Sequence, residues 1–100
     1  MDQIRPQVSV VIPTKNAGIA FRQTLEMIFK QKVAYPFEVL VIDSGSQDDT
    51  LSTCRQFPVK ILNIPPQDFN HGATRNYAIS RAQGEFIVLR QRQVFGPGRV

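Results

Sequence analysis

The sequence predicts an α/β protein with three layers, α/β/α, built around a mainly parallel sheet of about four strands. Four short apolar runs, rich in β-branched residues, are separated by polar turns and by stretches with helical spacing of apolar residues. Strands that alternate with helices of this length form right-handed βαβ units, which set the strands parallel. At 100 residues, the chain can form at most one such domain.

The first strand and helix are well marked. Val8–Ile12 is a β-branched apolar run that stops at a proline, as expected for a strand buried on both faces. Over residues 19–31, apolar residues recur at i, i+4, i+7 and i+8, which is the spacing of an amphipathic helix. A second buried strand is predicted for Phe37–Ile42.

The second helix is predicted from the residues that precede it. Ser46 and Asp49 have the N-cap and N3 spacing of a capping box, with Asp in place of the usual Glu. A helix is therefore expected from about Gln47 to Gln56. The third strand is expected at Val59–Ile64, where two prolines end it.

The last predicted elements are a helix from about Ala73 to Ala82 and a strand at Glu85–Leu89. His71, just before this helix, is interpreted as its N-terminal cap or as a polar contact. Residues 90–100 have no periodicity and contain a Gly-Pro-Gly sequence, which disfavours regular structure. We therefore expect a domain over residues 1–89 and an irregular C-terminal tail over 90–100.

The net charge of +4 does not indicate a nucleic-acid binder. All eight Asp/Glu and nine of the twelve Lys/Arg lie in residues 1–89, so the predicted domain is nearly neutral. A face that binds a phosphate backbone would be basic across the domain. Nucleic acid is therefore not an expected partner.

The sequence favours a cytoplasmic location. The longest apolar runs have the size of strands, so no transmembrane segment is expected. Residues 1–6 lack the apolar core of a secretory signal. Cys54 is the single cysteine, which excludes an internal disulfide and agrees with a reducing compartment.

Polar residues gather where the first two predicted strands end, which is the edge at which open parallel sheets bind ligands. Asp43, followed by Ser44, could accept hydrogen bonds from a base or ribose, or could simply cap a turn. Pro13, Thr14, Lys15 and Asn16 follow the first strand and offer a hydroxyl, an ammonium and an amide group. A plain turn would explain these residues equally well.

Arg75 lies near the start of the third predicted helix, where free N–H groups and the helix dipole attract anions. Its guanidinium could clamp a diphosphate, or it could be an ordinary solvated helix residue. Asp48 and Asp49 are interpreted as helix-start residues stabilised by the dipole.

Other nucleotide and metal motifs are absent. The turn after the first strand contains only Gly18, whereas a dinucleotide site needs Gly-x-Gly-x-x-Gly there. The Walker A pattern is missing, and no Cys/His cluster suggests zinc.

Taken together, these segments resemble family 2 glycosyltransferases of the inverting GT-A type. The resemblance covers residues 8–89 in the correct order, and the run 69–76 looks most like the rhamnosyltransferase branch. Its three motifs are Val-Ser-Val-Val-Ile-Pro-Thr-Lys-Asn at 8–16, Asp-Ser-Gly-Ser-Gln-Asp-Asp-Thr at 43–50 and His-Gly-Ala-Thr-Arg-Asn at 71–76. Each motif is modest alone, but the ordered set is specific.

The resemblance implies a Rossmann-like, partial GT-A fold in which residues 1–89 are the nucleotide-sugar-binding half. The donor would be a nucleotide-diphosphate sugar such as dTDP-rhamnose, and the acceptor a polysaccharide or other glycan. Asp43 would hydrogen-bond the base, and Arg75 would reach the nucleotide or its diphosphate. The expected binding residues are Pro13, Thr14, Lys15, Asp43, Ser44 and Arg75.

The resemblance ends after Leu89. There the family places an Asp-x-Asp-like motif or Gln-Asp-Ala, which in full-length members supports Mg²⁺ or Mn²⁺ and a carboxylate base. This chain reads Arg-Gln-Arg-Gln at 90–93 and has no Asp or Glu after Glu85. We therefore assign no catalytic residue and no metal ligand, and expect the chain alone to bind no metal and to be inactive.

Three explanations of this departure stay open: a truncated product, a frameshift that reads 90–100 out of register, or a genuine variant. The alternative function is a non-catalytic module that binds a nucleotide or a partner. A sheet that ends at its fourth strand would also expose an apolar edge, which favours self-association.

Overall fold

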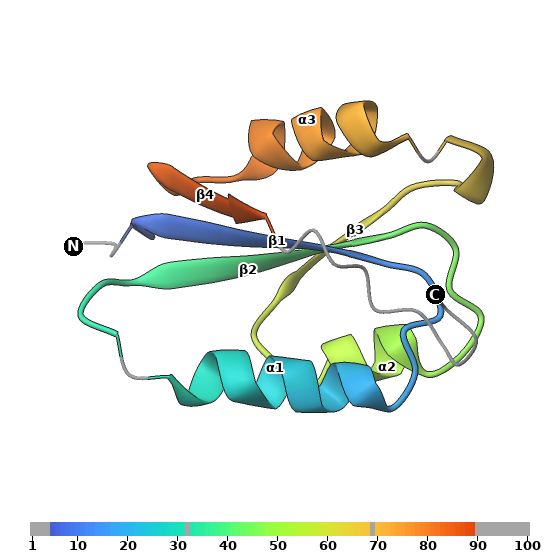
Figure 1. Ribbon diagram of the computed structural model, residues 1–100, viewed down its shortest axis with the longest axis horizontal. Coiled ribbons are helices and arrows are strands. Elements are labelled where there is room, and N and C mark those ends of the chain that lie inside the picture. Colours follow the sequence, from blue (N-terminus) through green and yellow to red (C-terminus); the bar gives the residue numbers. More distant parts are fainter. Residues whose placement is uncertain (1–4, 32, 69, 90–100) are drawn as a thin grey trace.

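The computed structural model describes residues 5–31, 33–68 and 70–89 and has the predicted three-layer α/β/α arrangement. Its four strands form one parallel sheet in the order β3-β2-β1-β4. Figure 1 shows α1 and α2 on one face of this sheet and α3 on the other. In chain order the elements are β1 (Val8–Thr14), α1 (Ala20–Lys30), β2 (Phe37–Asp43), α2 (Thr50–Cys54), β3 (Lys60–Asn63), the short 3-10 helix η1 (Pro66–Asp68), α3 (His71–Arg81) and β4 (Phe86–Leu89).

The two central strands carry the core. β1 and β2 pair along their whole length, from Val8 opposite Phe37 to Thr14 opposite Asp43. On the α1 face, Phe21 and Leu25 are fully buried against β1 and β2, and each such side chain contributes about 1.5–3 kcal/mol by leaving water. The α3 face holds a second cluster, centred on Val11, Leu40, Ile42 and Ala78. Helices thus cover both faces of the central strands, which explains their continuous apolar sequence.

The predicted capping box of the second helix is wrong. α2 begins at Thr50, and Asp49 in the cap position makes no side-chain capping bond. The Ser46 hydroxyl instead donates to Asp43 at 2.5 Å and accepts from the Asn16 amide at 2.7 Å, so it is not available to a helix end. The helix is accordingly shorter than expected and ends at Cys54.

The third helix begins at His71, two residues before the predicted start. Its N-cap is Asn70, whose side-chain oxygen accepts from the Ala73 amide at 3.0 Å. The capping role considered for His71 is therefore wrong. The irregular tail expected over 90–100 lies outside the described residues.

At the amino ends of the strands, a partly buried polar network ties the α3–β4 turn to the sheet. The Glu38 carboxylate accepts from the Ser9 hydroxyl and from the Gln83 amide, each at 2.6 Å. Ser9 in turn accepts from the Gly84 amide at 2.8 Å, and Lys60 lies 3.0 Å from the carboxylate. These contacts join β1, β2, β3 and the turn before β4.

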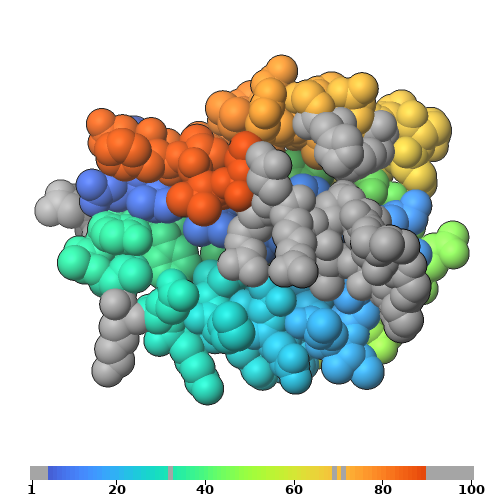
Figure 2. Space-filling view, viewed as in Figure 1, coloured from blue at the N-terminus to red at the C-terminus, as the bar shows by residue number. Residues whose placement is uncertain are grey.

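The fourth strand lies at one edge of the sheet and is partly exposed. β4 pairs with β1 on one side, and its side chains Phe86 and Val88 remain 57% and 47% exposed. Figure 2 shows β4 at the surface of this face. The longest described helices, α1 and α3, have 11 residues each, and within the described ranges no helix has the length and apolarity of a membrane span.

Candidate functional site

The predicted site residues of the first two strands come together at the carboxyl edge of the sheet. Thr14 and Asp43 are the last residues of β1 and β2 and lie opposite each other in the sheet register. Ser44 is bound to the same place, because its amide donates to the Thr14 carbonyl at 3.1 Å. Pro13 and Lys15 flank Thr14 and are half-buried. The structure therefore groups five of the six predicted residues.

Arg75, the sixth predicted residue, is exposed and lies on α3, which follows β3 at the same edge of the sheet. The segment leading to α3 is packed against the turn after β2. A Cβ on Gly45 would lie 2.5 Å from the Pro66 ring. The two segments are therefore so close that only glycine fits at position 45. Gly45 also has φ of +90°, a conformation that favours glycine.

The Asp43 side chain is almost fully enclosed, with 1% of its surface exposed. Its Oδ1 accepts from the Thr14 hydroxyl at 2.8 Å and from the Ser46 hydroxyl at 2.5 Å. Its Oδ2 accepts from the amides of Gly45 at 3.2 Å and Ser46 at 2.8 Å. An ionised carboxylate has about four acceptor positions. A direct bond from Asp43 to a base stays a prediction, and it would require the loss of one of these four donors.

Asp48 forms a second carboxylate–hydroxyl pair. Its Oδ1 accepts from the Thr50 hydroxyl at 2.5 Å and from the Thr50 amide at 2.9 Å, and its Oδ2 accepts from the Gly18 amide at 3.1 Å. Burial raises the pKa of Asp48, but these hydrogen bonds outweigh it and hold the pKa below its ordinary value. Asp48 is thus more than the helix-start residue predicted from the sequence.

We call residues 14–18 the β1 turn and residues 43–50 the β2 turn. The two carboxylate–hydroxyl pairs hold these turns against each other. Three successive amides of the β1 turn each donate to a side chain of the β2 turn. The bonds are Asn16 N to Ser46 Oγ at 2.7 Å, Ala17 N to Thr50 Oγ1 at 2.9 Å and Gly18 N to Asp48 Oδ2 at 3.1 Å.

Asn16 adds a bond in the opposite direction, because its side-chain oxygen accepts from the Gln47 amide at 2.7 Å. Asn16 has φ of +50°, and asparagine is one of the few residues that tolerate this left-handed conformation. The amides of residues 16–18 are therefore all engaged within the protein. Lys15 is the cation that this turn offers.

The sequence placed Asn16 and Ser46 in the candidate segments but not among the expected binding residues, and it assigned neither Asp48 nor Thr50 to the site. The available signal was an acid followed closely by a hydroxyl residue: Asp43 with Ser46 three residues later, and Asp48 with Thr50 two residues later. The sequence instead indicated a capping box of Ser46 with Asp49, whereas Ser46 and Thr50 accept hydrogen bonds from the β1 turn.

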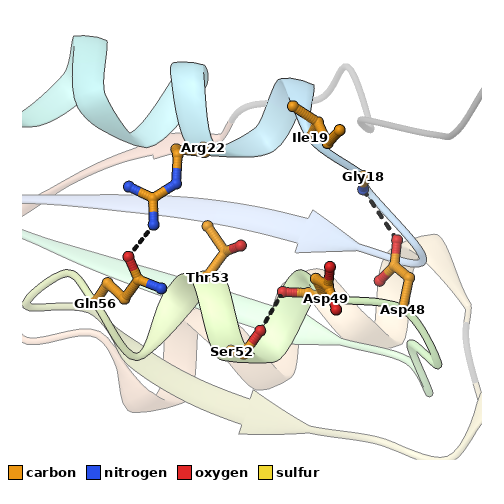
Figure 3. A pocket seen from close by; sticks show the side chains of 8 residues that line it. All are labelled: Gly18, Ile19, Arg22, Asp48, Asp49, Ser52, Thr53 and Gln56. Atoms are coloured by element: carbon orange, nitrogen blue, oxygen red, sulfur yellow. Dashed lines mark hydrogen bonds between the residues drawn. The ribbon is translucent and has the colours of Figure 1, made fainter.

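An open hollow of about 430 Å³ lies beside these turns, between α1 and α2 (Figure 3). Its polar groups are largely paired with each other: Arg22 donates to the Gln56 side chain, and Gly18 donates to Asp48. None of the six predicted binding residues lines it. The lining residues are Gly18, Ile19, Arg22, Asp48, Asp49, Ser52, Thr53 and Gln56.

The part of the chain that the structure describes does not assemble a metal site. Within residues 5–31, 33–68 and 70–89, no group of three or more His, Cys, Asp or Glu side chains is arranged to hold an ion.

The chain is similar to bacterial and archaeal glycosyltransferases in sequence and in structure. It is 38% identical over 84 residues to the O-antigen chain rhamnosyltransferase RfbN of Salmonella typhimurium, covering 83% of this chain and 26% of that protein. It is 36% identical over 92 residues to the O-antigen chain rhamnosyltransferase WbaN of Salmonella anatum, covering 90% of this chain and 29% of that protein. The chain thus spans little more than a quarter of the length of these relatives.

Two solved structures share the fold. The crystal structure of Staphylococcus aureus TarS 1–349 superposes with a TM-score of 0.74 and 28% identity, covering 88% of this chain and 27% of that one. The mannosyltransferase PcManGT from Pyrobaculum calidifontis, in complex with GDP-Man and Mn²⁺, superposes with a TM-score of 0.68 and 28% identity, covering 95% of this chain and 30% of that one. Residues 9–89 match glycosyl transferase family 2. The chain belongs to this family and carries part of its GT-A fold.

Proposed function

We propose that residues 1–89 bind the nucleotide portion of a sugar donor at the carboxyl edge of the sheet, as the donor half of a glycosyltransferase. The observation that carries the proposal is that hydrogen bonds join the β1 and β2 turns on both sides of Lys15. The proposed binding residues are Pro13, Thr14, Lys15, Asp43, Ser44 and Arg75.

The charges in this set suit a diphosphate. Lys15 and Arg75 are cationic, and charge-assisted hydrogen bonds to phosphate oxygens are about twice as strong as neutral ones. Thr14, Asp43 and Ser44 are buried and form the floor on which the nucleotide lies. The donor is thus bound by side-chain cations above a floor whose own polar groups are already paired.

The donor we propose is a dTDP-linked deoxysugar such as dTDP-rhamnose, and the acceptor a glycan or polysaccharide. The support is the identity of 36–38% with two O-antigen chain rhamnosyltransferases. The GDP-Man in the PcManGT complex makes a guanine nucleotide the competing donor. Its Mn²⁺ supports the use of Mg²⁺ or Mn²⁺ by full-length relatives.

Calorimetric titration of dTDP, UDP and GDP, with and without Mn²⁺, tests the proposal. We expect one nucleotide to bind without metal, and Lys15→Ala and Arg75→Ala each to weaken it about tenfold, the usual effect of losing a charged hydrogen bond. Lys30→Ala and Arg81→Ala, exposed cations elsewhere on α1 and α3, are the matched controls. Failure of all three nucleotides to bind would refute the proposal.

We further propose that the chain alone does not transfer sugar, since no Asp or Glu follows Glu85 to serve as metal ligand or base. The same observation favours the second candidate, a non-catalytic nucleotide-binding or interaction module. The encoding DNA distinguishes a truncated or frameshifted enzyme from such a module. An acidic metal motif restored in another reading frame after Leu89 would identify the former.

Self-association through β4 is a further part of the proposal. Phe86 and Val88 are half-exposed on this strand, and exposed apolar strand edges favour association. Light scattering should show a mass above 11.3 kDa that falls in Phe86→Lys. A monomer at all concentrations would contradict it. A cytoplasmic location also stays a prediction, supported by the single, buried cysteine Cys54.

A further inference from the structure

The β2 turn contains the same polar device twice. In each, a carboxylate accepts the hydrogen of a hydroxyl, so that the hydroxyl oxygen is left to accept a backbone N–H of the β1 turn. Asp43 orients Ser46 towards the Asn16 amide, and Asp48 orients Thr50 towards the Ala17 amide. The hydrogen of each hydroxyl is therefore donated to a carboxylate, and each hydroxyl oxygen acts as an acceptor of fixed direction.

The backbone on both sides of Lys15 is pinned by these contacts. Before it, the Thr14 carbonyl accepts from the Ser44 amide at 3.1 Å and the Ser44 hydroxyl at 3.3 Å. After it, Asn16 donates its amide to Ser46 at 2.7 Å and accepts from the Gln47 amide at 2.7 Å. The left-handed φ of Asn16 reverses the chain immediately after Lys15.

We propose that Asn16 is a positioning residue for donor binding: together with Ser46 and Asp43 it forms a relay that fixes the backbone of Lys15 at the carboxyl edge of the sheet. This inference rests on the proposed function, because it assigns to Lys15 the contact with the donor diphosphate. The relay runs from the buried Asp43 carboxylate through the Ser46 hydroxyl to the Asn16 amide. It gives Asp43 an indirect role, as the residue that orients Ser46.

The indirect role differs measurably from a direct bond between Asp43 and the base. If Asp43 contacts the base itself, removal of the Ser46 hydroxyl or the Asn16 side chain leaves the ligand contact in place. If Asp43 acts through the relay, loss of the Ser46 hydroxyl leaves the Asn16 amide without its acceptor and releases Lys15. Loss of the Asn16 side chain releases Lys15 by a second route, because it removes the bond from the Gln47 amide and the residue that tolerates the left-handed φ. The burial of Asp43 and its four protein donors favour the relay.

The test measures the Kd of dTDP, UDP and GDP at a temperature where circular dichroism shows every variant fully folded. Ser46→Ala and Asn16→Ala are expected to weaken the tightest of these nucleotides about tenfold. Ser46→Thr keeps the hydroxyl and should stay within about twofold of the wild type, as should Gln23→Ala, an exposed amide on α1 that serves as control. Asn16→Gly can keep the left-handed φ and loses only the side-chain acceptor. Its nucleotide affinity should therefore fall less than that of Asn16→Ala.

Unchanged affinity in both Ser46→Ala and Asn16→Ala would overturn the relay while leaving the proposed function intact. A wild-type chain that binds none of the three nucleotides would overturn the proposed function and the role of Lys15. Amide hydrogen exchange tests directly whether the Ser46 hydroxyl holds the Asn16 amide. The Asn16 amide should exchange about tenfold faster in Ser46→Ala than in Ser46→Thr. Equal exchange in these two variants would overturn the relay whatever the nucleotide titrations show.

Discussion

Gly84, in the turn between α3 and β4, should not tolerate even a methyl group. A Cβ at this position would lie 2.6 Å from the Ser9 hydroxyl oxygen and 2.7 Å from both the Ser9 nitrogen and the Val8 carbonyl carbon. Two of these three are backbone atoms of β1, which is paired on both sides and cannot retreat. In Gly84→Ala the turn must therefore move away from the sheet.

The cost of that movement can be estimated from the hydrogen bonds it breaks. The Gly84 amide would lose the Ser9 hydroxyl at 2.8 Å, and the Gln83 amide would lose the Glu38 carboxylate at 2.6 Å. A neutral bond contributes about 1 kcal/mol and a bond to a charged group about 1.5–3 kcal/mol. Alanine returns roughly 0.4–1 kcal/mol by restricting the unfolded chain. The net expectation is a loss of about 2–3 kcal/mol in the free energy of unfolding.

Urea unfolding followed by circular dichroism measures this change, and a fall of about 10–20 °C in the thermal midpoint should accompany it. Gly72→Ala is the matched control. Gly72 lies in α3, where a Cβ would meet nothing nearer than 3.6 Å, so helix propensity should make this variant more stable, by up to about 1 kcal/mol. A Gly84→Ala protein as stable as the wild type would refute the close approach of this turn to β1.

Three further predictions concern single side chains. Burial raises the pKa of Glu38, but hydrogen bonds from Ser9 and Gln83 and the nearby Lys60 outweigh it and hold the pKa below its ordinary value. The stability that Glu38 contributes is therefore complete above the unfolded-state pKa and is lost as the pH falls through the lower folded-state pKa. In a plot of the urea midpoint against pH, Glu38→Gln should therefore show a smaller fall at acid pH than the wild type. An unchanged slope would contradict this. Burial, aided by the nearby Asp43 charge, raises the pKa of Cys54 to about 11, so a thiol reagent at pH 8 should modify it slowly in the native protein and quickly in urea, and fast native modification would disprove its enclosure. Asn70→Ala should cost about 1 kcal/mol in a thermal melt by removing the cap of α3, whereas Asn70→Asp should keep most of that stability; equal loss in both would exclude capping.

The fold was predictable because its central strands are buried on both faces and its first helix on one. Continuous apolar runs identified β1 and β2, and the spacing of Phe21, Leu25 and Ile28 identified α1. The boundaries of α2 and α3 were less accurate. A short polar side chain can cap a nearby helix, as Asn70 does, or bind a residue far away in the sequence, as Ser46 does. The spacing of neighbouring residues does not reveal which of the two occurs.

The site was predictable in position but not in the state of its groups. The rule that ligands bind at strand ends placed Thr14 and Asp43 at one edge of the sheet, as the structure confirms. It could not show that Asp43 is saturated, because the Thr14 hydroxyl comes from 29 residues away. Nor could it show the left-handed Asn16, which is stabilised by contacts to the β2 turn. The direct roles of Lys15 and Arg75 stay predictions.

The bonds between the β1 and β2 turns also restrict how this domain can be recombined with its relatives. A hybrid gene joined in the linker at 33–36 would take residues 14–18 from one parent and 43–50 from the other. The β2 turn of one parent would then have to place its hydroxyl and carboxylate oxygens within hydrogen-bond distance of three successive amides of the other parent. A junction placed after Cys54 inherits both halves from one parent. The two segments are therefore exchanged most safely as a single block, although α1 and most of β2 separate them in the chain.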